Sequence, residues 1–429
     1  MTLATANPPA AAAGWHTPVA DDHPAAALLN AQAVRARCAA VMRHVEAGRS
    51  PLFSWHPEQL PAAAAYVADT IRRDYPDLAV PYHSRWRHFE AGGIDRWTAL
   101  AGAAGLDGAP LERARVAFDL VIPSVLLDAG AGAGWRYRDA AHDLTLARSE
   151  GLGVASFELF TAGTLSADPA LPLRCDAAAL ARLDTATLAA AFQASPANPL
   201  VGLDGRAALL RRLGEVIAAT PAVFGRPARL GNIVDYLAAR SSDGAIDAGE
   251  LLALLLRALG PVWPGRIALD GVSLGDCWRH PALAASAVDA GGDLLPFHKL
   301  TQWLAYSLLE PLQQAGFRIT GVDTLTGLPE YRNGGLLLDF GVIAARDPAF
   351  HTTPWTVDAP AIVEWRALTV IGLDRLAEAV RAELGLSAAD FPLPCVLQGG
   401  SWSAGRRIAA ERRPGGPPPL LIISDGTVF

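Results

Sequence analysis

The sequence predicts a mostly α-helical, compact fold with a few short strands. Along much of the chain, apolar residues recur at the three- and four-residue spacing of an amphipathic helix, and prolines or glycines separate one such segment from the next. Segments that alternate apolar and polar residues, as half-buried strands do, are sparse. No sequence unit returns at a fixed period, so a solenoid or propeller is not expected.

The expected helices carry recognisable start and stop signals. The first occupies residues 24–48, and Gly48 closes it. The second covers residues 57–76 and has a proline in its first turn. The third covers residues 111–130, where Pro123 predicts a kink or a break. Further helices are predicted over residues 178–193, 205–219, 229–240, 247–259, 297–315 and 358–385.

The strand signals and the bulk composition complete the expected organisation. The best strand patterns lie at residues 266–274 and 418–429. The chain has 429 residues, of which 51% are hydrophobic and 18% charged, so a large core is expected. We expect residues 1–24 to form a flexible tail. No change of composition marks a boundary within residues 25–429, which we expect to form one compact, mostly helical unit or two subdomains.

Composition also excludes several classes of partner. The net charge is −7 and no basic block is present, which argues against binding to nucleic acid. The strongest apolar run, residues 251–263, is interrupted and too short to span a bilayer, so no membrane partner is expected. The N-terminus lacks the basic start of a signal peptide. The cysteines are too widely spaced for a metal or disulfide motif, which favours a cytoplasmic protein with reduced thiols: Cys38, Cys175, Cys277 and Cys395.

A glycine-rich stretch, "DAGAGAGWRYRD" at residues 128–139, invites comparison with a dinucleotide-binding loop. Its spacing is GxGxG, whereas the fingerprint requires GxGxxG between a strand and a helix. We therefore interpret it as a helix stop and a turn. The polar residues that follow, including Arg148 and Glu150, fit either a ligand pocket or a solvated helix connection.

Histidines are present but lack the spacing of metal ligands. His56, His83 and His88 form neither an HExxH motif nor an i,i+4 pair. We expect no bound metal or other cofactor. Trp86, with an arginine on either side, fits a stacking wall or a core tryptophan beneath snorkelling side chains.

Three segments combine charged residues with strongly apolar flanks, at residues 294–309, 322–343 and 362–376. A solvated loop does not need apolar flanks, and a core segment does not need so many polar groups. Glu364 shares a helix face with apolar residues, so it should be buried and needs a partner, for instance an arginine of the core. The candidate site residues in these segments are His298, Lys299, Trp303, Asp323, Tyr331, Arg332, Asp339, Glu364 and Arg366.

Four motifs resemble the uracil-catabolism protein family of the URC pathway of fungi and bacteria. They are "TGLPEYRNGGLLLDFGV", "VEWRALTV", "LQGGSWSAGRRIA" and the closing "SDGTVF". The resemblance extends from about residue 53 to the C-terminus. It implies a role in a pathway that opens uracil at the nucleoside or nucleotide level, with ribosylurea-type intermediates.

A weaker resemblance links "FHK..Q", an aspartate before "LP", and "VEWRA" to the queuosine-salvage nucleoside glycosidases, which are helical and similar in shape to DNA glycosylases. It implies that Lys299 binds the ribose. Asp323 is the nearest aspartate before "LP", and Asp339 is the alternative catalytic carboxylate. Glu364 and Arg366 match the third motif.

The two resemblances together predict a hydrolytic N-glycosidase acting on a ribosylurea-like or pyrimidine-derived nucleoside. A carboxylate would stabilise the oxocarbenium-like sugar and activate water. Asp323, Glu364 and Asp339 are the candidate carboxylates, and Trp303 and Tyr331 the candidate stacking surfaces. His298, Lys299, Arg332 and Arg366 complete the expected substrate-binding set.

Two alternatives remain open from the sequence. One is a metal-dependent hydrolase of the urea or amide portion, and the other is a non-catalytic protein that binds a ligand of the same pathway. The partner expected in each case is a small nucleoside-like molecule. For the glycosidase, Lys299, Asp323 and Glu364 should border one cavity.

Overall fold

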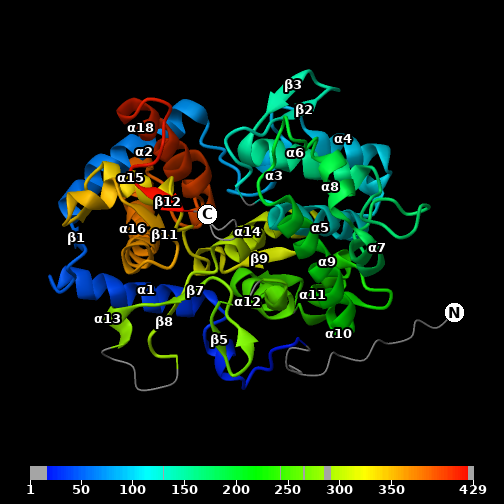
Figure 1. Ribbon diagram of the computed structural model, residues 1–429, viewed down its shortest axis with the longest axis horizontal. Helices are drawn as coiled ribbons and strands as arrows, with labels where there is room; N and C mark the ends of the chain where they lie inside the picture. The colour runs from blue at the N-terminus through cyan, green and yellow to red at the C-terminus, as the bar shows by residue number, and fades with distance from the viewer. Residues whose placement is uncertain (1–16, 129, 242, 264–265, 285–290, 424–429) are drawn as a thin grey trace.

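The computed structural model describes residues 17–128, 130–241, 243–263, 266–284 and 291–423 (Figure 1). The protein is mostly helical, as predicted, and its described strands are two or three residues long. None of the helices within these ranges is both long and apolar enough to cross a bilayer.

The α-helices are α1 (Ala31–Glu46), α2 (Leu60–Asp74), α3 (Trp86–Phe89), α4 (Arg96–Ala103), α5 (Pro110–Leu126), α6 (Arg148–Thr161), α7 (Ala177–Arg182), α8 (Thr185–Ala191), α9 (Leu203–Ala219), α10 (Pro221–Phe224), α11 (Ile233–Arg240), α12 (Ala248–Leu259), α13 (Pro281–Ala284), α14 (Lys299–Gln314), α15 (Asn333–Asp339), α16 (Pro360–Leu384), α17 (Leu393–Cys395) and α18 (Trp402–Arg412). Short 3-10 helices are η1 (Pro24–Ala27), η2 (Pro57–Gln59), η3 (Leu106–Gly108), η4 (Leu230–Asn232), η5 (Gly260–Val262), η6 (Val322–Thr324) and η7 (Pro348–His351), and η8 (Val396–Ser401) is a π-helix.

The strands form separate two-stranded sheets. The antiparallel pairs are β1 (Phe53–Trp55) with β10 (Ile343–Ala345), β2 (Tyr137–Asp139) with β3 (Leu144–Leu146), β5 (Ala268–Leu269) with β6 (Val272–Ser273), and β7 (Cys277–Arg279) with β8 (Leu294–Pro296). The parallel pairs are β4 (Ala245–Asp247) with β9 (Arg318–Thr320), and β11 (Pro354–Thr356) with β12 (Leu421–Ile423).

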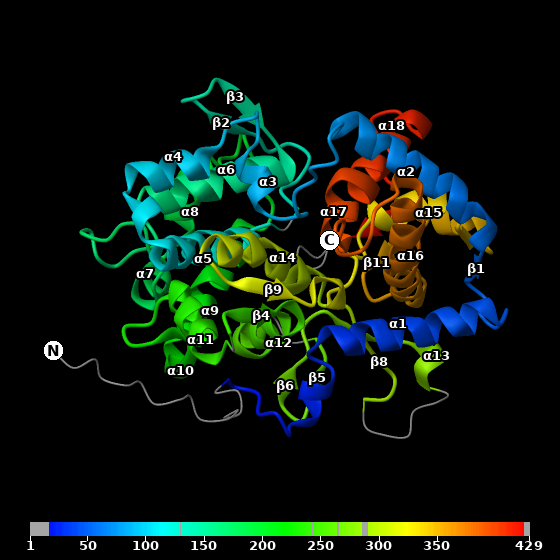
Figure 2. The ribbon, with the colours of Figure 1, turned by 180° about the vertical axis from the view of Figure 1, so that it is seen from behind.

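Two groups of helices lie on either side of α14 (Figures 1 and 2). One group holds α3 to α9, and α14 packs against its helix α5. The other holds α1, α2 and α15 to α18, with α16 packed against α1 and α2. One cluster of buried apolar side chains extends from Val19 to Leu420 and includes both groups. The space between the groups is therefore bounded by packed helices.

Helical periodicity located most of the long helices. The segments predicted at 205–219, 297–315 and 358–385 correspond closely to α9, α14 and α16. Pro123 lies inside α5 without ending it. The segment predicted at 178–193 is two helices, α7 and α8, because Asp184 caps the start of the second.

Where the apolar periodicity of the sequence is weak, helices were not predicted. Helices α6 and α18 were not predicted, although both contribute to the candidate site described below. In the predicted tail, residues 1–16 lie outside the described part, and Val19 is buried. The C-terminal strand is confirmed over Leu421–Ile423, while the motif "SDGTVF" lies outside the described residues.

The adjacent glycines Gly334 and Gly335 belong to α15 and do not interrupt it. A Cβ atom on Gly334 would lie 2.4 Å from Cζ2 of Trp365 and 2.6 Å from Oγ1 of Thr369, both on α16. The glycine therefore serves the close approach of two helices.

We expect Gly334→Ala to lower the free energy of unfolding by about 1–3 kcal/mol, because the added methyl overpacks a rigid indole. Gly205→Ala is the matched control, since it also replaces a helical glycine but has no atom within 4 Å of the new Cβ. There we expect a gain of about 0.5–1 kcal/mol from helix propensity. Urea denaturation of both variants measures the difference, and equal effects would contradict the close-packing account.

Candidate functional site

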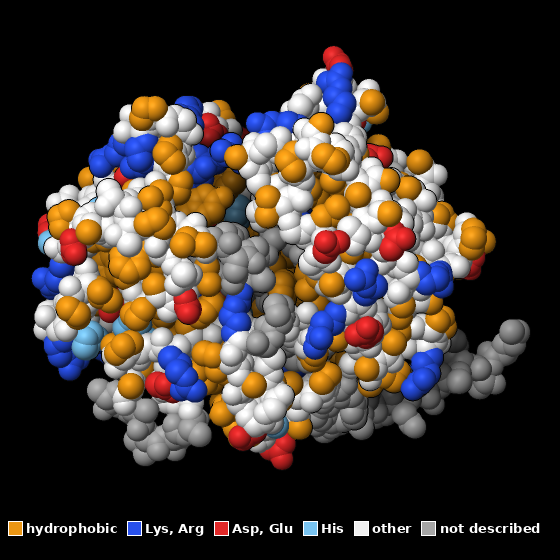
Figure 3. Space-filling model, viewed as in Figure 1, with side chains coloured by type: hydrophobic (Ala, Val, Ile, Leu, Met, Phe, Trp, Pro, Cys, Tyr) orange, Lys and Arg blue, Asp and Glu red, His pale blue; other side chains and the backbone are white. Residues whose placement is uncertain are grey.

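A cavity of about 150 Å³ lies where the two groups of helices meet α14, and we call it the central cavity. On the face shown in Figure 3 the surface is hollowed between the two groups. The cavity is lined by His83, His88, Asp128, Gly130, Arg148, Ser149, Glu150, Lys299, Leu300, Trp303, Leu328, Glu330, Tyr331, Arg332, Trp402 and Arg406. Four of the predicted site residues are among them: Lys299, Trp303, Tyr331 and Arg332.

Lys299 enters the cavity from the first turn of α14. The residue before it, His298, has φ = +50° and gives the helix no side-chain cap. The carboxylate of Asp276 caps the helix instead, accepting the Lys299 backbone N–H at 3.0 Å. Burial lowers the pKa of the Lys299 ammonium, and the negative charge of Glu330 acts in the opposite direction.

Glu330 supplies a buried carboxylate to the same cavity. It lies in the turn before α15, where its two oxygens accept the backbone N–H groups of Arg332 (2.7 Å) and Asn333 (2.6 Å). Burial raises the pKa of Glu330, although these hydrogen bonds and the Lys299 charge act to lower it. The central cavity thus holds a carboxyl group and an amine whose pKa values are shifted toward each other.

Aromatic rings form much of the remaining wall. The ring of Trp303 lies 5.5 Å from that of His88 and 6.4 Å from that of His83, measured between centroids, and His83 lies 5.6 Å from Trp402. Burial lowers the pKa of His83 to about 4 and of His88 to about 3, so both imidazoles are neutral at pH 7. The wall therefore presents flat surfaces of low charge, which suit a base or a urea group.

Arg85 lies beneath this wall, fully buried. Its Nη1 donates to Oδ1 of Asp128 at 2.7 Å and to Nδ1 of His88 at 3.0 Å. Because Nδ1 of His88 accepts, the ring proton of that histidine is on Nε2. Trp86 is also buried and donates to the backbone carbonyl of Ser307, so it is a core tryptophan rather than a stacking wall of the cavity.

Arg366 joins the two parts of the chain that carry Lys299 and Glu330. Its Nη1 and Nη2 each lie 2.8 Å from a carboxylate oxygen of Asp276, and its Nε donates to the carbonyl of Pro329 at 3.2 Å. Burial acts to raise the pKa of Asp276, but the Arg366 guanidinium holds it well below its usual range. Arg366 does not line the central cavity, yet it contacts the backbone supports of both residues.

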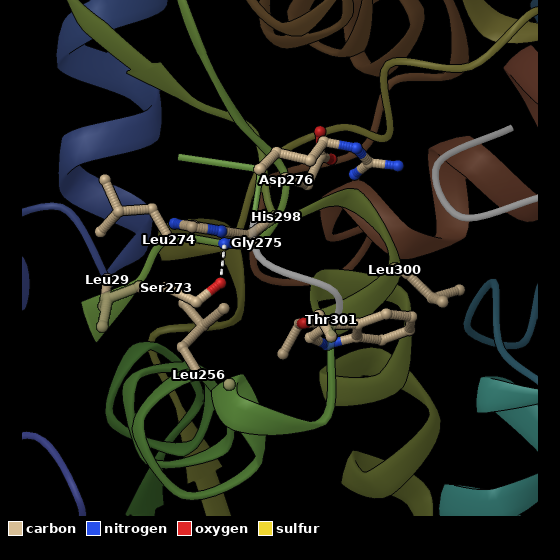
Figure 4. A pocket seen from close by; sticks show the side chains of 12 residues that line it. Leu29, Leu256, Ser273, Leu274, Gly275, Asp276, His298, Leu300 and Thr301 are labelled. Atoms are coloured by element: carbon tan, nitrogen blue, oxygen red, sulfur yellow. Dashed lines mark hydrogen bonds between the residues drawn. The ribbon is translucent and has the colours of Figure 1, made fainter. Parts of the chain in front are cut away.

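His298 faces a smaller cavity beside the first. Its Nε2 donates to the carbonyl of Leu28 at 2.9 Å, and burial lowers its pKa. Figure 4 shows His298 and Asp276 among apolar side chains in this second cavity, whose volume is about 30 Å³. That volume is enough for only one or two water molecules.

The predicted carboxylates lie elsewhere. Asp323 is 40% exposed, accepts the backbone N–H of Leu393 at 2.8 Å, and pairs with Arg381. Asp323 thus caps the start of α17. Asp339 forms a bidentate pair with Arg413 at 2.7 and 2.6 Å.

Glu364 is buried, as predicted, but its partners are a serine and a histidine, not an arginine. It accepts a short hydrogen bond from Ser50 and lies 3.3 Å from Nε2 of His280. Of Lys299, Asp323 and Glu364, only Lys299 lines the central cavity, so the expectation of one shared cavity is wrong for the other two. Catalytic roles for Asp323, Asp339 and Glu364 stay predictions.

Sequence reasoning missed Glu330, Trp402 and Arg406 as site residues, although all three lie in motifs that carry the family resemblance. Glu330 stood within the conspicuous stretch at 322–343 but was overlooked in favour of the aspartates. Arg406 and Trp402 lie on the unpredicted helix α18. Arg148 and Glu150 do line the cavity, the first of the two alternatives considered for them. Within the described ranges, no group of three His, Cys, Asp or Glu side chains could hold a metal ion.

Comparison with known proteins adds the following matches. Residues 27–429 match the family described as "Protein of unknown function (DUF1688)". "Protein urg3" of Schizosaccharomyces pombe is 38% identical over 414 residues, covering 94% of this chain and 98% of that protein. "Uracil catabolism protein 4" of Lachancea kluyveri is 37% identical over 441 residues, covering 95% and 99%. The predicted resemblance to the uracil-catabolism family is confirmed, whereas the resemblance to glycosidases stays a prediction.

The buried Arg366–Asp276 pair gives a test by stability. We expect Arg366→Met to lower the free energy of unfolding by about 3–5 kcal/mol, because it leaves Asp276 buried without its counter-charge. Arg375→Met on the same helix is the matched control. It removes a pair with Glu46 in which both side chains are about one-third exposed, and should cost less than about 1 kcal/mol. Denaturation curves of the two variants check this, and similar losses would contradict the role given to burial.

Proposed function

The chain belongs to the DUF1688 family, and from that premise we propose that it acts in uracil catabolism as a hydrolase of an N-glycosidic bond. The substrate class is a ribosylurea-like or pyrimidine-derived nucleoside. The name of the relative from Lachancea kluyveri supports the pathway, and the central cavity supports the chemistry.

One observation carries the proposal. The central cavity holds Glu330, a carboxyl group of raised pKa, together with Lys299, an amine of lowered pKa, against an aromatic wall. A general base is most effective when its pKa lies near the working pH, so a raised carboxyl pKa suits catalysis better than an ordinary one. A cavity that served only to bind a neutral base would not need a buried carboxyl group beside an amine.

The proposed reaction breaks the bond between C1′ of the sugar and nitrogen. The bonding electron pair leaves on nitrogen, and C1′ becomes an oxocarbenium-like centre. Glu330 stabilises that positive charge and takes a proton from the attacking water, whose oxygen bonds C1′. The proton that Glu330 takes from water passes to the leaving nitrogen, so Glu330 returns to a carboxylate and the products are free sugar and an N–H compound.

The other cavity residues bind and orient the substrate. Lys299 donates hydrogen bonds to ribose hydroxyl groups, and Trp303 and Tyr331 stack on the planar base or urea. His88 presents a neutral ring with its proton on Nε2. It can therefore donate a hydrogen bond to the substrate without placing a second charge beside Glu330. Glu330 takes the place that the sequence assigned to Asp323.

A second candidate, a non-catalytic ligand-binding protein, is favoured by one specific observation. Both oxygens of Glu330 accept backbone N–H groups at the start of α15, which is what a purely structural cap would do. A cap needs only an acceptor, whereas the glycosidase needs a charge that can take up a proton. A charge-removing substitution separates these roles.

We expect purified protein to release ribose or ribose phosphate from at least one of uridine, ribosylurea and their 5′-phosphates. Glu330→Gln should lower kcat by a factor on the order of a hundred or more, because the amide cannot act as a base. Asp323→Asn is the control: since Asp323 lies outside the cavity, turnover per folded molecule should stay near wild type.

Melting temperatures of both variants show whether a loss of activity results from a loss of folding. If Glu330→Gln keeps near-normal turnover, Glu330 is only a helix cap and the glycosidase mechanism loses its carboxylate. If no substrate of the four yields a sugar, the binding protein is the better account.

The pH–rate profile gives an independent prediction. Glu330 acts as a base only when deprotonated, and its pKa is raised, so kcat should begin to fall at a pH above the range of an ordinary glutamate, about 4.3. Lys299 donates fully when protonated, and its pKa is lowered, so the alkaline fall should begin below about 10.4. Residual activity of Glu330→Gln should lack the acidic fall. An unchanged acidic fall would assign it to another group.

A further inference from the structure

Three arginines reach the central cavity from three separate elements. Arg148 begins α6, Arg332 immediately precedes α15, and Arg406 lies on α18. Arg332 is buried, with 8% of its surface exposed, and its guanidinium lies 5.2 Å from the ring of Tyr331. Helices from both groups therefore direct positive charge at one space.

The carboxylates of the cavity offset only part of this charge. Glu330 accepts two backbone N–H groups, as described above. Asp128 accepts from the buried Arg85 at 2.7 Å and from the hydroxyl of Ser149 at 3.1 Å. Among the carboxylates of the described residues, only Glu150 pairs with one of the three arginines, at 3.1 Å from Nη1 of Arg406.

Arg332 and Arg148 thus lack an acidic partner within the described chain. The guanidinium of Arg332 donates to the backbone carbonyl of Gly416 at 3.0 Å, and no carboxylate of the described residues pairs with Arg148. A guanidinium has five N–H donors, so most of those on the buried Arg332 are available to a ligand.

The arginines are close enough to repel one another. Burial first, and then the charges of Arg406 and Arg148, lower the pKa of Arg332, against the opposite influence of Tyr331 and Glu330. When a folded protein holds like charges together in a partly buried space, an anion that binds among them relieves their repulsion and stabilises the protein.

The start of α6 adds to the positive charge at the central cavity. Its N-cap, Ala147, has no side chain that can accept from the first turn, and Arg148 has φ = +53°, a conformation rare for residues other than glycine. The positive end of this 14-residue helix is therefore uncapped by a side chain where it meets the cavity. Uncapped helix N-termini bind phosphate groups, and strained backbone is common at binding sites.

We propose that Arg332, Arg148 and Arg406 form an anion subsite for a phosphate monoester, so that the substrate is a ribose 5′-phosphate derivative rather than the free nucleoside. The proposal rests on the glycosidase function for the identity of the sugar. A dianionic phosphate matches the excess of arginine over free carboxylate, and planar guanidinium groups bind its oxygens in pairs. Arg332 is the buried member of this subsite.

Calorimetric titration of the full chain tests the subsite without depending on turnover. At low ionic strength, we expect ribose 5-phosphate to bind at least tenfold more tightly than ribose, because charged hydrogen bonds are added. Arg332→Gln and Arg148→Gln should each weaken ribose 5-phosphate by about tenfold while leaving ribose affinity unchanged. Arg412→Gln is the matched control, an exposed arginine at the far end of α18, and should have no effect.

The outcomes separate this subsite from the proposed activity. Equal affinities for ribose and ribose 5-phosphate, or a phosphate preference that survives both substitutions, would overturn the subsite. In that case, hydrolysis of uridine or ribosylurea would still support the proposed glycosidase activity. The expected binding pattern without release of sugar from any of the four substrates supports the subsite and overturns the glycosidase. Because Arg148 is exposed, Arg148→Gln keeps the test informative even if Arg332→Gln does not fold.

Discussion

The buried pair of Asp276 and Arg366 is the constraint on which the candidate site depends. Asp276 caps the helix that begins with Lys299, and Arg366 donates to the carbonyl of Pro329, next to Glu330. Two charged groups buried together gain little net stability over apolar side chains, but removing either one is costly. The pair therefore links the start of α14 to the segment that carries Glu330. In that arrangement an amine and a carboxyl group from distant parts of the chain share one cavity.

The walls of the central cavity are supported in the same way, by buried arginines that bind buried groups behind them. Arg85, fully buried on the opposite wall, orients His88 and holds Asp128, just as Arg366 orients the segment around Glu330. Buried guanidinium groups thus act as supports behind the wall on both sides. The arginines that line the cavity differ, because two of them have no carboxylate partner in the described chain. Supporting and binding arginines are distinguished by their partners and not by their burial.

Sequence reasoning was successful where one face of a long helix is buried, as in α1 and α2, because burial imposes a period that can be read directly. It did not predict α15, which contains two adjacent glycines, residues of low helix propensity, one of which, Gly334, allows close packing against Trp365. It found Lys299 and Trp303 because polar residues in apolar flanks are conspicuous. It preferred Asp323 to Glu330 because the glycosidase resemblance implies an aspartate before "LP", and sequence order does not show that Glu330 is buried whereas Asp323 is exposed and caps α17. That distinction depends on long-range packing.

The walls of the central cavity come from positions as far apart as His83 and Arg406. Such a site has no local precursor: it is absent from any partly synthesised or partly unfolded chain, and it forms only after the slow, long-range contacts of folding are complete. A ligand that binds there recognises the finished fold alone, so its binding free energy is added to the stability of the entire chain. The abundance of the ligand in the cell would then set how long each molecule of the protein survives degradation.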